Sequence, residues 1–344
     1  MAKDPVPLKS LPAEINIASR SLHTQLNRLI TSRLPLGLPP HASSPTLYTT
    51  GLLHFAHIYL TFESLWQDLL PSPSHTTSPS SPLLSFLLVD PWDADADNTS
   101  PPTSPQMLEF LRNLRLKGLS RSGRLRRDLK TLTGLSETDL SVQLSQFPGA
   151  KVQEYCAHIR KAVAQKPHVL VAYAWCYYMA VFSGGRWIRS ELMKAGEGFW
   201  RGGEKRAGSS VSLGEAGLSF FSFPGTEDGE DIKAEFKERL AAAEDLFTAR
   251  EREEVVAEAS EIFKYSANLV RELDELLATS QEKLAAVEAA VKDKEKAEEV
   301  ERAMVRVQRR PRAWLRRPEV TGMVVALSCV AWFAVYHMGT IIVP

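Results

Sequence analysis

The stretch AYAWCYYMAVFSGGRWIRSEL, residues 172–192, decides the fold of this chain. From Val169 to Phe182 the sequence is apolar on every helical face, and the helical pattern then continues through Gly184 and Gly185. We expect a helix buried on every side, because this apolar run is too short to span a membrane. Each glycine inside a helix costs roughly 1 kcal/mol relative to alanine. The pair either lets another helix pack closely or leaves bare backbone against which a planar apolar ligand can lie.

Helical periodicity extends to both sides of this stretch. Apolar residues recur at spacings of three and four over residues 11–33, and further helices are expected over 47–70, 230–247 and 250–305. Strand signals are scarce, so we predict an all-α fold. The 344 residues are 44% hydrophobic, which is ample for a core. Because 41 basic residues balance 41 acidic ones, the basic excess typical of nucleic-acid-binding proteins is missing.

Composition divides the chain into three expected parts. Residues 1–280 form the helical domain, interrupted at 71–105 by a disordered Ser/Pro-rich insertion that is too polar to pack. Residues 281–317 form a charged helical stalk with a basic flank. Residues 318–344 form a C-terminal transmembrane anchor.

The membrane prediction depends on an apolar stretch and the basic segment before it. Residues 321–343 contain no Asp, Glu, Lys or Arg and match the roughly 20 residues that a helix needs to cross a bilayer. The preceding segment RRPRAWLRRPE, residues 309–319, favours the cytosolic side. We therefore expect a tail-anchored protein with its helical domain in the cytosol. The basic flank is compatible with the endoplasmic reticulum membrane, which is the destination that we expect. The outer mitochondrial membrane is the alternative destination.

Three side chains stand out as possible ligand contacts. His23 shares a helix face with Leu26 and Ile30, where a histidine is either a hydrogen-bonded core residue or a ligand. Lys233 and Lys237 are four residues apart on one helix, so their ammonium groups project together. They either hold a pair of carboxylates or belong to a solvated face.

The remaining histidines and the cysteines point to structure. His54 and His57 are three apart on a helix, a spacing compatible with a metal ion, but no third ligand accompanies them. Cys156, Cys176 and Cys329 lack the spacing of a zinc site or a disulfide framework. We assign all five to structure.

Five segments, in the same order, resemble segments of heme oxygenases. They are SLHTQLNRL, LSRSGRLRRDL, VLVAYAWCYYMAVFSGGRW, GLSFFSFPG and IKAEFKERL. The resemblance covers about residues 10–280 and implies a heme-oxygenase-like helical domain. It identifies His23 as the axial ligand of the heme iron, and Gly184 and Gly185 as the distal backbone that lies close over the macrocycle. By the same resemblance, Lys233 and Lys237 meet the heme propionates, and Phe263 lines the pocket.

The chain departs from the family pattern where oxygen is activated. Members of the family carry Gly-Asp where this chain has Ala180 and Val181, and valine cannot donate, accept or orient water. Tyr177 replaces an arginine of the same network, and Asn16 stands where a basic propionate partner is common. Ligand binding should survive these changes better than oxygen activation. Protons would then have to pass through water, with Tyr177 or Tyr178 as partners.

The resemblance implies an enzyme that cleaves heme to biliverdin, carbon monoxide and ferrous iron. Its electrons would come from NADPH through a membrane flavoprotein reductase. The alternative is a non-catalytic protein that binds or senses heme, which Val181 favours. A helical membrane adaptor without heme is a third reading, disfavoured because His23 is present. We favour the enzyme because the proximal, propionate-binding and anchoring features are retained.

Overall fold

The computed structural model describes residues 10–69, 104–200 and 217–277, together with positions 289, 293, 296 and 297. The chain divides into two compact units, Met1–Leu284 and Ala285–Pro344. Within the described residues all regular structure is helical, which confirms the predicted all-α class.

Three predicted segments lie wholly or mainly outside the described residues. They are the insertion, the stalk and the transmembrane anchor. No helix in the part of the chain that the structure describes is both long and apolar enough to cross a membrane.

Within each of the described ranges the helices follow one another with short connections. The longer ones are α1 (Leu11–Arg33), α2 (Thr46–Leu69), α4 (Pro105–Leu114), α5 (Ser122–Thr133), α6 (Glu137–Leu144), α7 (Ala150–Gln165), α9 (Met179–Lys194), α11 (Glu230–Ala242) and α12 (Ala249–Leu276). The shorter ones are η1 (Leu34–Gly37), η2 (Pro167–Val169), α8 (Leu170–Tyr173), η3 (Ala174–Tyr178), α10 (Gly196–Trp200), η4 (Ser219–Phe221) and η5 (Glu244–Leu246).

Local sequence signals explain where several helices begin. Helix α1 occupies the predicted range, with Pro12 in its first turn, where a missing N–H costs nothing. Helix α4 begins at Pro105, inside the segment predicted as insertion, because the Ser104 side chain accepts a hydrogen bond from the backbone N–H of Met107.

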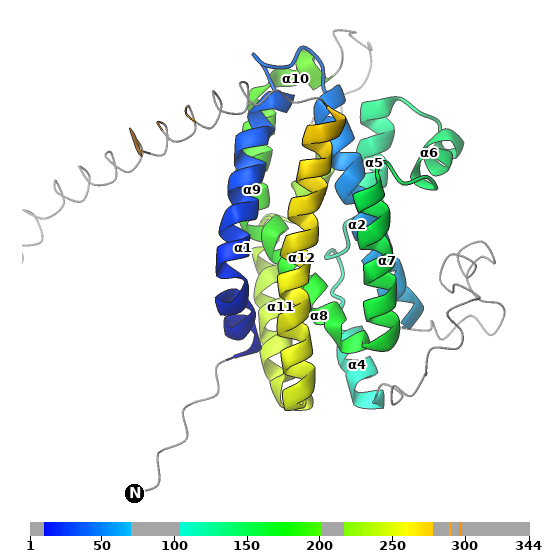
Figure 1. Cartoon of the computed structure of the whole chain (residues 1–344), viewed down its shortest axis with the longest axis vertical. Helices are drawn as coiled ribbons and strands as arrows, with labels where there is room; N and C mark the ends of the chain where they lie inside the picture. The colour runs from blue at the N-terminus through cyan, green and yellow to red at the C-terminus, as the bar shows by residue number, and fades with distance from the viewer. Residues whose placement is uncertain are drawn as a thin grey trace, which may run out of the picture. The chain divides into compact units, whose positions relative to one another are not determined.

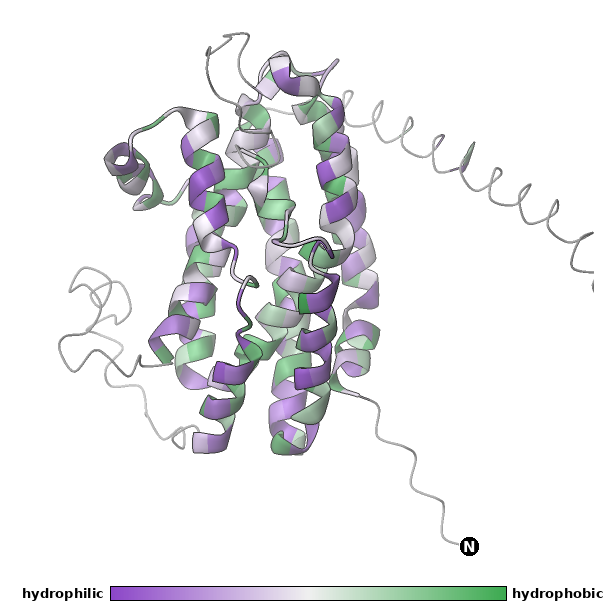
Figure 2. Cartoon of the chain, turned by 180° about the vertical axis from the view of Figure 1, so that it is seen from behind, coloured by the Kyte–Doolittle hydropathy of each residue, from purple (hydrophilic) through white to green (hydrophobic). Residues whose placement is uncertain are grey.

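Helix α1 packs along α12, and α2 packs against both α5 and α7. Figure 1 shows α12 between α1 on one side and α2, α5 and α7 on the other. The ribbons in Figure 2 are striped along the helices by hydrophilic and hydrophobic residues, as amphipathic helices require.

The glycine-containing helix is continuous, as predicted, but it is not regular. A π-helical segment, η3, joins α8 to α9, and α9 then runs through both glycines. Such local widening of a helix is common at functional sites. The expectation that Val169 to Phe182 is buried on every side is wrong at Ala180, which is exposed, as is Gly184 one turn later. The exposed face borders a cavity.

Candidate functional site

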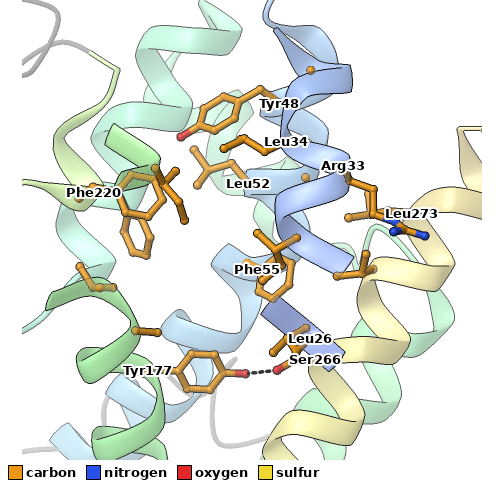
Figure 3. A pocket seen from close by; sticks show the side chains of 18 of the residues that line it. Leu26, Arg33, Leu34, Tyr48, Leu52, Phe55, Tyr177, Phe220, Ser266 and Leu273 are labelled. Carbon is orange, nitrogen blue, oxygen red and sulfur yellow. Dashed lines mark hydrogen bonds between the residues drawn. The ribbon is translucent and has the colours of Figure 1, made fainter. Parts of the chain in front are cut away.

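An apolar cavity of about 290 Å³ opens between α1, α2, α9 and α12. The turn η4 contributes Phe220, which lies across the cavity from α1 in Figure 3. The lining includes Leu26, Ile30, Arg33, Tyr48, Leu52, Phe55, Tyr59, Cys176, Tyr177, Ala180, Val181, Ile188, Phe220, Phe221, Phe263, Ser266 and Val270. A concave, mainly apolar surface with few polar groups is typical of a site for a hydrophobic small molecule.

One row of residues on the glycine-containing helix faces this cavity. Cys176, Ala180 and Ile188 all line the cavity, and a spacing of four places residues on one helix face. Gly184 falls in the same row. A Cβ atom added to Gly184 would have no neighbouring atom within 4 Å. The middle of the row therefore presents almost bare backbone to open space.

Gly185 has different surroundings from its neighbour. It is buried, and an added Cβ atom would lie 3.0 Å from Cδ1 of Phe221 and 3.5 Å from Cγ1 of Val181. Its missing side chain makes room for the turn that carries Phe221. Of the two explanations for the glycine pair, the open surface fits Gly184 and close packing fits Gly185.

His23 is exposed on α1, at the edge of the cavity. Its ring centre is 5.6 Å from that of Phe263 on α12, with the two rings nearly perpendicular. Leu26 and Ile30, which share its helix face, line the cavity, whereas His23 itself does not. The structure thus brings together two residues, His23 and Phe263, that were singled out separately from the sequence.

The two lysines lie away from the cavity lining. Lys233 pairs with Glu230 at 3.3 Å on α11, and Lys237 is exposed. Asn16 accepts a hydrogen bond of 3.1 Å from the indole N–H of Trp175. It therefore takes part in packing α1 against the glycine-containing helix.

A chain of three hydroxyl groups reaches the cavity, and only one of its members, Tyr177, was singled out from the sequence. The Tyr177 hydroxyl lies 3.0 Å from Oγ of Ser266, as Figure 3 shows, and 2.9 Å from the hydroxyl of Tyr155. Burial raises the pKa of Tyr177 well above its usual range, so its phenol remains protonated at neutral pH. Ser266 follows Phe263 by three residues on α12, and this spacing was the one available signal that both face the same cavity.

The number of hydroxyl hydrogens indicates which of the three hydroxyl groups donate and which accept. Tyr155, Tyr177 and Ser266 carry three hydroxyl hydrogens but form only two hydrogen bonds with one another. One hydrogen therefore remains for another acceptor. Within the described residues, neither Tyr155 nor Ser266 has a further side-chain hydrogen bond. Tyr155 is fully buried, and an unpaired donor there would cost about 1–3 kcal/mol. The favoured order runs from Tyr155 through Tyr177 to Ser266, whose hydrogen is then available to a ligand in the cavity.

Tyr178 does not contact the cavity, although the sequence suggested it beside Tyr177. Its hydroxyl donates a hydrogen bond of 3.0 Å to the buried carboxylate of Glu63. The same carboxylate accepts bonds from the backbone N–H groups of Arg121 and Ser122, at 2.7 and 3.0 Å. Tyr178 therefore belongs to a structural network.

Comparisons with known proteins agree with this architecture. The family model described as heme oxygenase matches residues 106–272. The heme-binding protein HMX1 of Saccharomyces cerevisiae is 25% identical over 280 residues, which cover 79% of this chain and 78% of that protein. Human heme oxygenase 1 is 29% identical over 126 residues, which cover 37% of this chain and 38% of the human protein.

Solved structures share the fold at low sequence identity. Heme oxygenase 2 from Chlamydomonas reinhardtii without heme superposes with a TM-score of 0.55 and 17% identity, covering 77% of this chain and 98% of that one. Heme oxygenase-2 from Synechocystis, in complex with heme and NO, gives a TM-score of 0.56 and 15% identity, covering 82% of this chain and 93% of that one. The solved structures show a shared helical fold, and the matched family model and the relatives show that this chain belongs to the heme oxygenase family.

Proposed function

We propose that this protein binds heme in the cavity between α1 and α9 and cleaves it oxidatively. The products would be biliverdin, carbon monoxide and ferrous iron, formed with dioxygen and with NADPH-derived electrons from a flavoprotein reductase. One observation carries the proposal. The α1 face that bears His23 and the side-chain-poor row through Gly184 border the same apolar cavity.

The residues at the cavity suit a flat apolar macrocycle with one polar edge. His23 would hold the iron, and Gly184 would let the ring approach the backbone of α9. Phe263 would fix the imidazole orientation by edge contact. Lys233 and Lys237 lie outside the cavity lining, so their proposed contact with the two propionates requires the polar edge of heme to extend beyond the cavity toward α11. Bound heme supplies the redox centre that reacts with dioxygen, and the protein orients it, excludes water and manages protons.

Proton handling would fall to hydroxyl groups instead of a carboxylate. Val181 lines the cavity and offers no polar atom. Ser266 is oriented as a donor toward the cavity by Tyr177 and Tyr155 behind it. A hydroxyl chain of this kind strengthens its terminal donor through polarisation. We propose that it orders the water that delivers protons.

The first test titrates the full-length chain, purified in a mild detergent, with hemin and follows the absorption spectrum. His23→Ala should remove the histidine-ligated spectrum and weaken hemin binding by about tenfold or more, because the axial bond is lost. The exposed His41→Ala variant serves as the matched control and should bind like the wild type. An unchanged spectrum in His23→Ala would refute the ligand assignment.

A second candidate function is heme binding without turnover. The apolar Val181 in the cavity favours it, and the yeast relative carries the name of a heme-binding protein. Adding a flavoprotein reductase and NADPH to the hemin complex separates the two functions. Appearance of biliverdin supports the enzyme, whereas heme that stays intact supports the binding protein.

We also propose that residues 321–343 anchor the protein in the endoplasmic reticulum membrane. The support is sequence alone: an uncharged apolar stretch follows an arginine-rich flank. Expressed in cells, the full chain should resist extraction by alkaline carbonate, and a chain ending at residue 317 should be released. Co-localisation with mitochondrial markers would favour the outer mitochondrial membrane.

A further inference from the structure

The segment that carries Phe220 and Phe221 into the cavity is held by a buried acid on α5. Asp128 is fully buried. Its carboxylate accepts hydrogen bonds from the N–H of Ser219 at 3.0 Å, the hydroxyl of Ser219 at 2.6 Å and the N–H of Phe220 at 2.7 Å. These bonds fix the amide side of η4.

Arginine side chains fix the carbonyl side of the same segment. Arg121, also fully buried, donates to the carbonyl groups of Phe220 at 3.2 Å and Ser222 at 2.8 Å. Its guanidinium lies 4.2 Å from the ring centre of Phe223. Arg189 on α9 donates to the carbonyl group of Phe221 at 3.3 Å. The N–H groups of this turn are therefore bound by a carboxylate, and its carbonyl groups are bound by guanidinium groups.

Burying an acid and an arginine in a core is costly unless each charge is matched by hydrogen bonds. Packing of the phenylalanine rings alone would not need either charge. What the charges add is a fixed position, because bidentate guanidinium and carboxylate contacts restrict direction as well as distance. Position matters here, since Phe221 lies against Gly185 with no spare room for one extra carbon atom.

We propose that Asp128 and Arg121 are positioning residues that set the distance between the η4 turn and α9 at Gly185. In doing so they would determine whether a planar macrocycle fits into the cavity. This inference rests on the proposed function for its ligand. It also gives a physical role to two sequence motifs, since LSRSGRLRRDL supplies both charged residues and GLSFFSFPG is the segment that they hold.

The first experiment needs no ligand. In Asp128→Asn the carboxamide nitrogen would face a backbone N–H, so at least one bond to the turn is lost. Amide hydrogen exchange in peptides covering residues 217–224 should become at least about tenfold faster. Leu140→Ala is the control, because Leu140 is fully buried on α6 and its truncation lowers global stability without removing a bond to the turn. Exchange no faster than in this control would overturn the proposal.

The second experiment measures hemin affinity in the same variants of the full-length chain. Asp128→Asn and Arg121→Lys should each raise the Kd by about tenfold, while Leu140→Ala leaves it within about twofold. Arg121→Lys keeps the positive charge and covers the case in which Asp128→Asn fails to fold. If amide exchange in the turn became faster in these variants but their hemin affinity did not change, the proposed effect on ligand fit would be refuted. A wild type that binds no hemin refutes the proposed function, and the exchange experiment then still decides whether these residues hold the turn.

Discussion

Gly184 and Gly185 are neighbours in sequence, but their missing side chains face different surroundings. A Cβ atom at Gly184 would enter open space beside the cavity, and one at Gly185 would press on the ring of Phe221. The consequences of adding a methyl group should therefore differ. A helix gains about 1 kcal/mol from alanine in place of glycine when nothing obstructs it.

We expect Gly184→Ala to raise the free energy of unfolding of the ligand-free protein by up to about 1 kcal/mol and to weaken hemin binding. Gly185→Ala should lower the free energy of unfolding by about 1 kcal/mol or more, because Phe221 belongs to a turn that cannot move freely. Urea denaturation and hemin titration of both variants check the pair. If Gly184→Ala bound hemin as well as the wild type, the row would not face the ligand.

Val181→Asp and Ser266→Ala change the hydrogen-bonding capacity of the cavity in opposite directions. The first adds a carboxylate at a lining position, and the second removes the hydroxyl at the end of the tyrosine chain. If proton delivery limits turnover, biliverdin formed per heme should rise in Val181→Asp and fall about tenfold or more in Ser266→Ala. Single-turnover absorption measurements follow both. Wild-type yield in Ser266→Ala would exclude the hydroxyl chain from proton handling.

At the scale of elements, the π-helical segment η3 decides which residues of the central helix meet the cavity. Cys176 and Tyr177 lie in η3, whereas Ala180 and Val181 lie in α9, and all four line the cavity. The wider turn changes the angular position of everything that follows it. Within η3 itself, Tyr177 reaches Ser266 while its neighbour Tyr178 points to Glu63.

Helix α12 carries both Phe263 and Ser266, and its first turn is stabilised by a cap. Thr248 and Glu251 form a reciprocal cap, with bonds of 3.2 Å and 2.8 Å between side chain and backbone. Thr248→Ala should lower the free energy of unfolding by about 1 kcal/mol. Chemical denaturation measures this, with Ser260→Ala in the middle of α12 as the control. Equal stability of the two variants would contradict the role of the cap.

At the scale of the whole molecule, buried histidines link stability to pH. Desolvation, with the nearby charges of His54 and Arg160, lowers the pKa of His57 to about 4. The Nε2 atoms of His54 and His57 are buried and have no hydrogen-bond partner among the described residues. Both imidazoles are therefore held in the neutral form at neutral pH.

The protein should lose stability as the pH falls from about 6.5 to about 4, since the unfolded chain binds a proton in this range that folded His57 does not. The loss attributable to His57 amounts to about 3 kcal/mol when the pH reaches 4. Urea midpoints measured across this range check the slope. His57→Leu should make the slope shallower, while His54, whose pKa burial also lowers, continues to contribute. An identical slope in the variant would show that His57 is not the source.

The candidate site was partly predictable. His23, Phe263 and Gly184 were singled out from sequence, and the structure places all three at or beside one cavity. Their roles toward heme stay predictions. Ser266 was missed because its one signal, the spacing of three residues from Phe263, is common to many residues of an amphipathic helix. Lys233 does not line the cavity, because α11 packs on residues of the glycine-containing helix that face away from it, such as Tyr178 and Arg186.

The sequence by itself determined the helical class, the extent of α1 and α2, the continuity of the helix through the glycines and the family. These follow from periodicity and from motifs, which are local properties of the chain. Only the tertiary structure decided that Gly185 packs under Phe221 and that Asp128 holds the turn carrying that ring. Each of these contacts joins segments far apart in the chain. Their existence depends on how whole helices pack, which no local pattern of residues encodes.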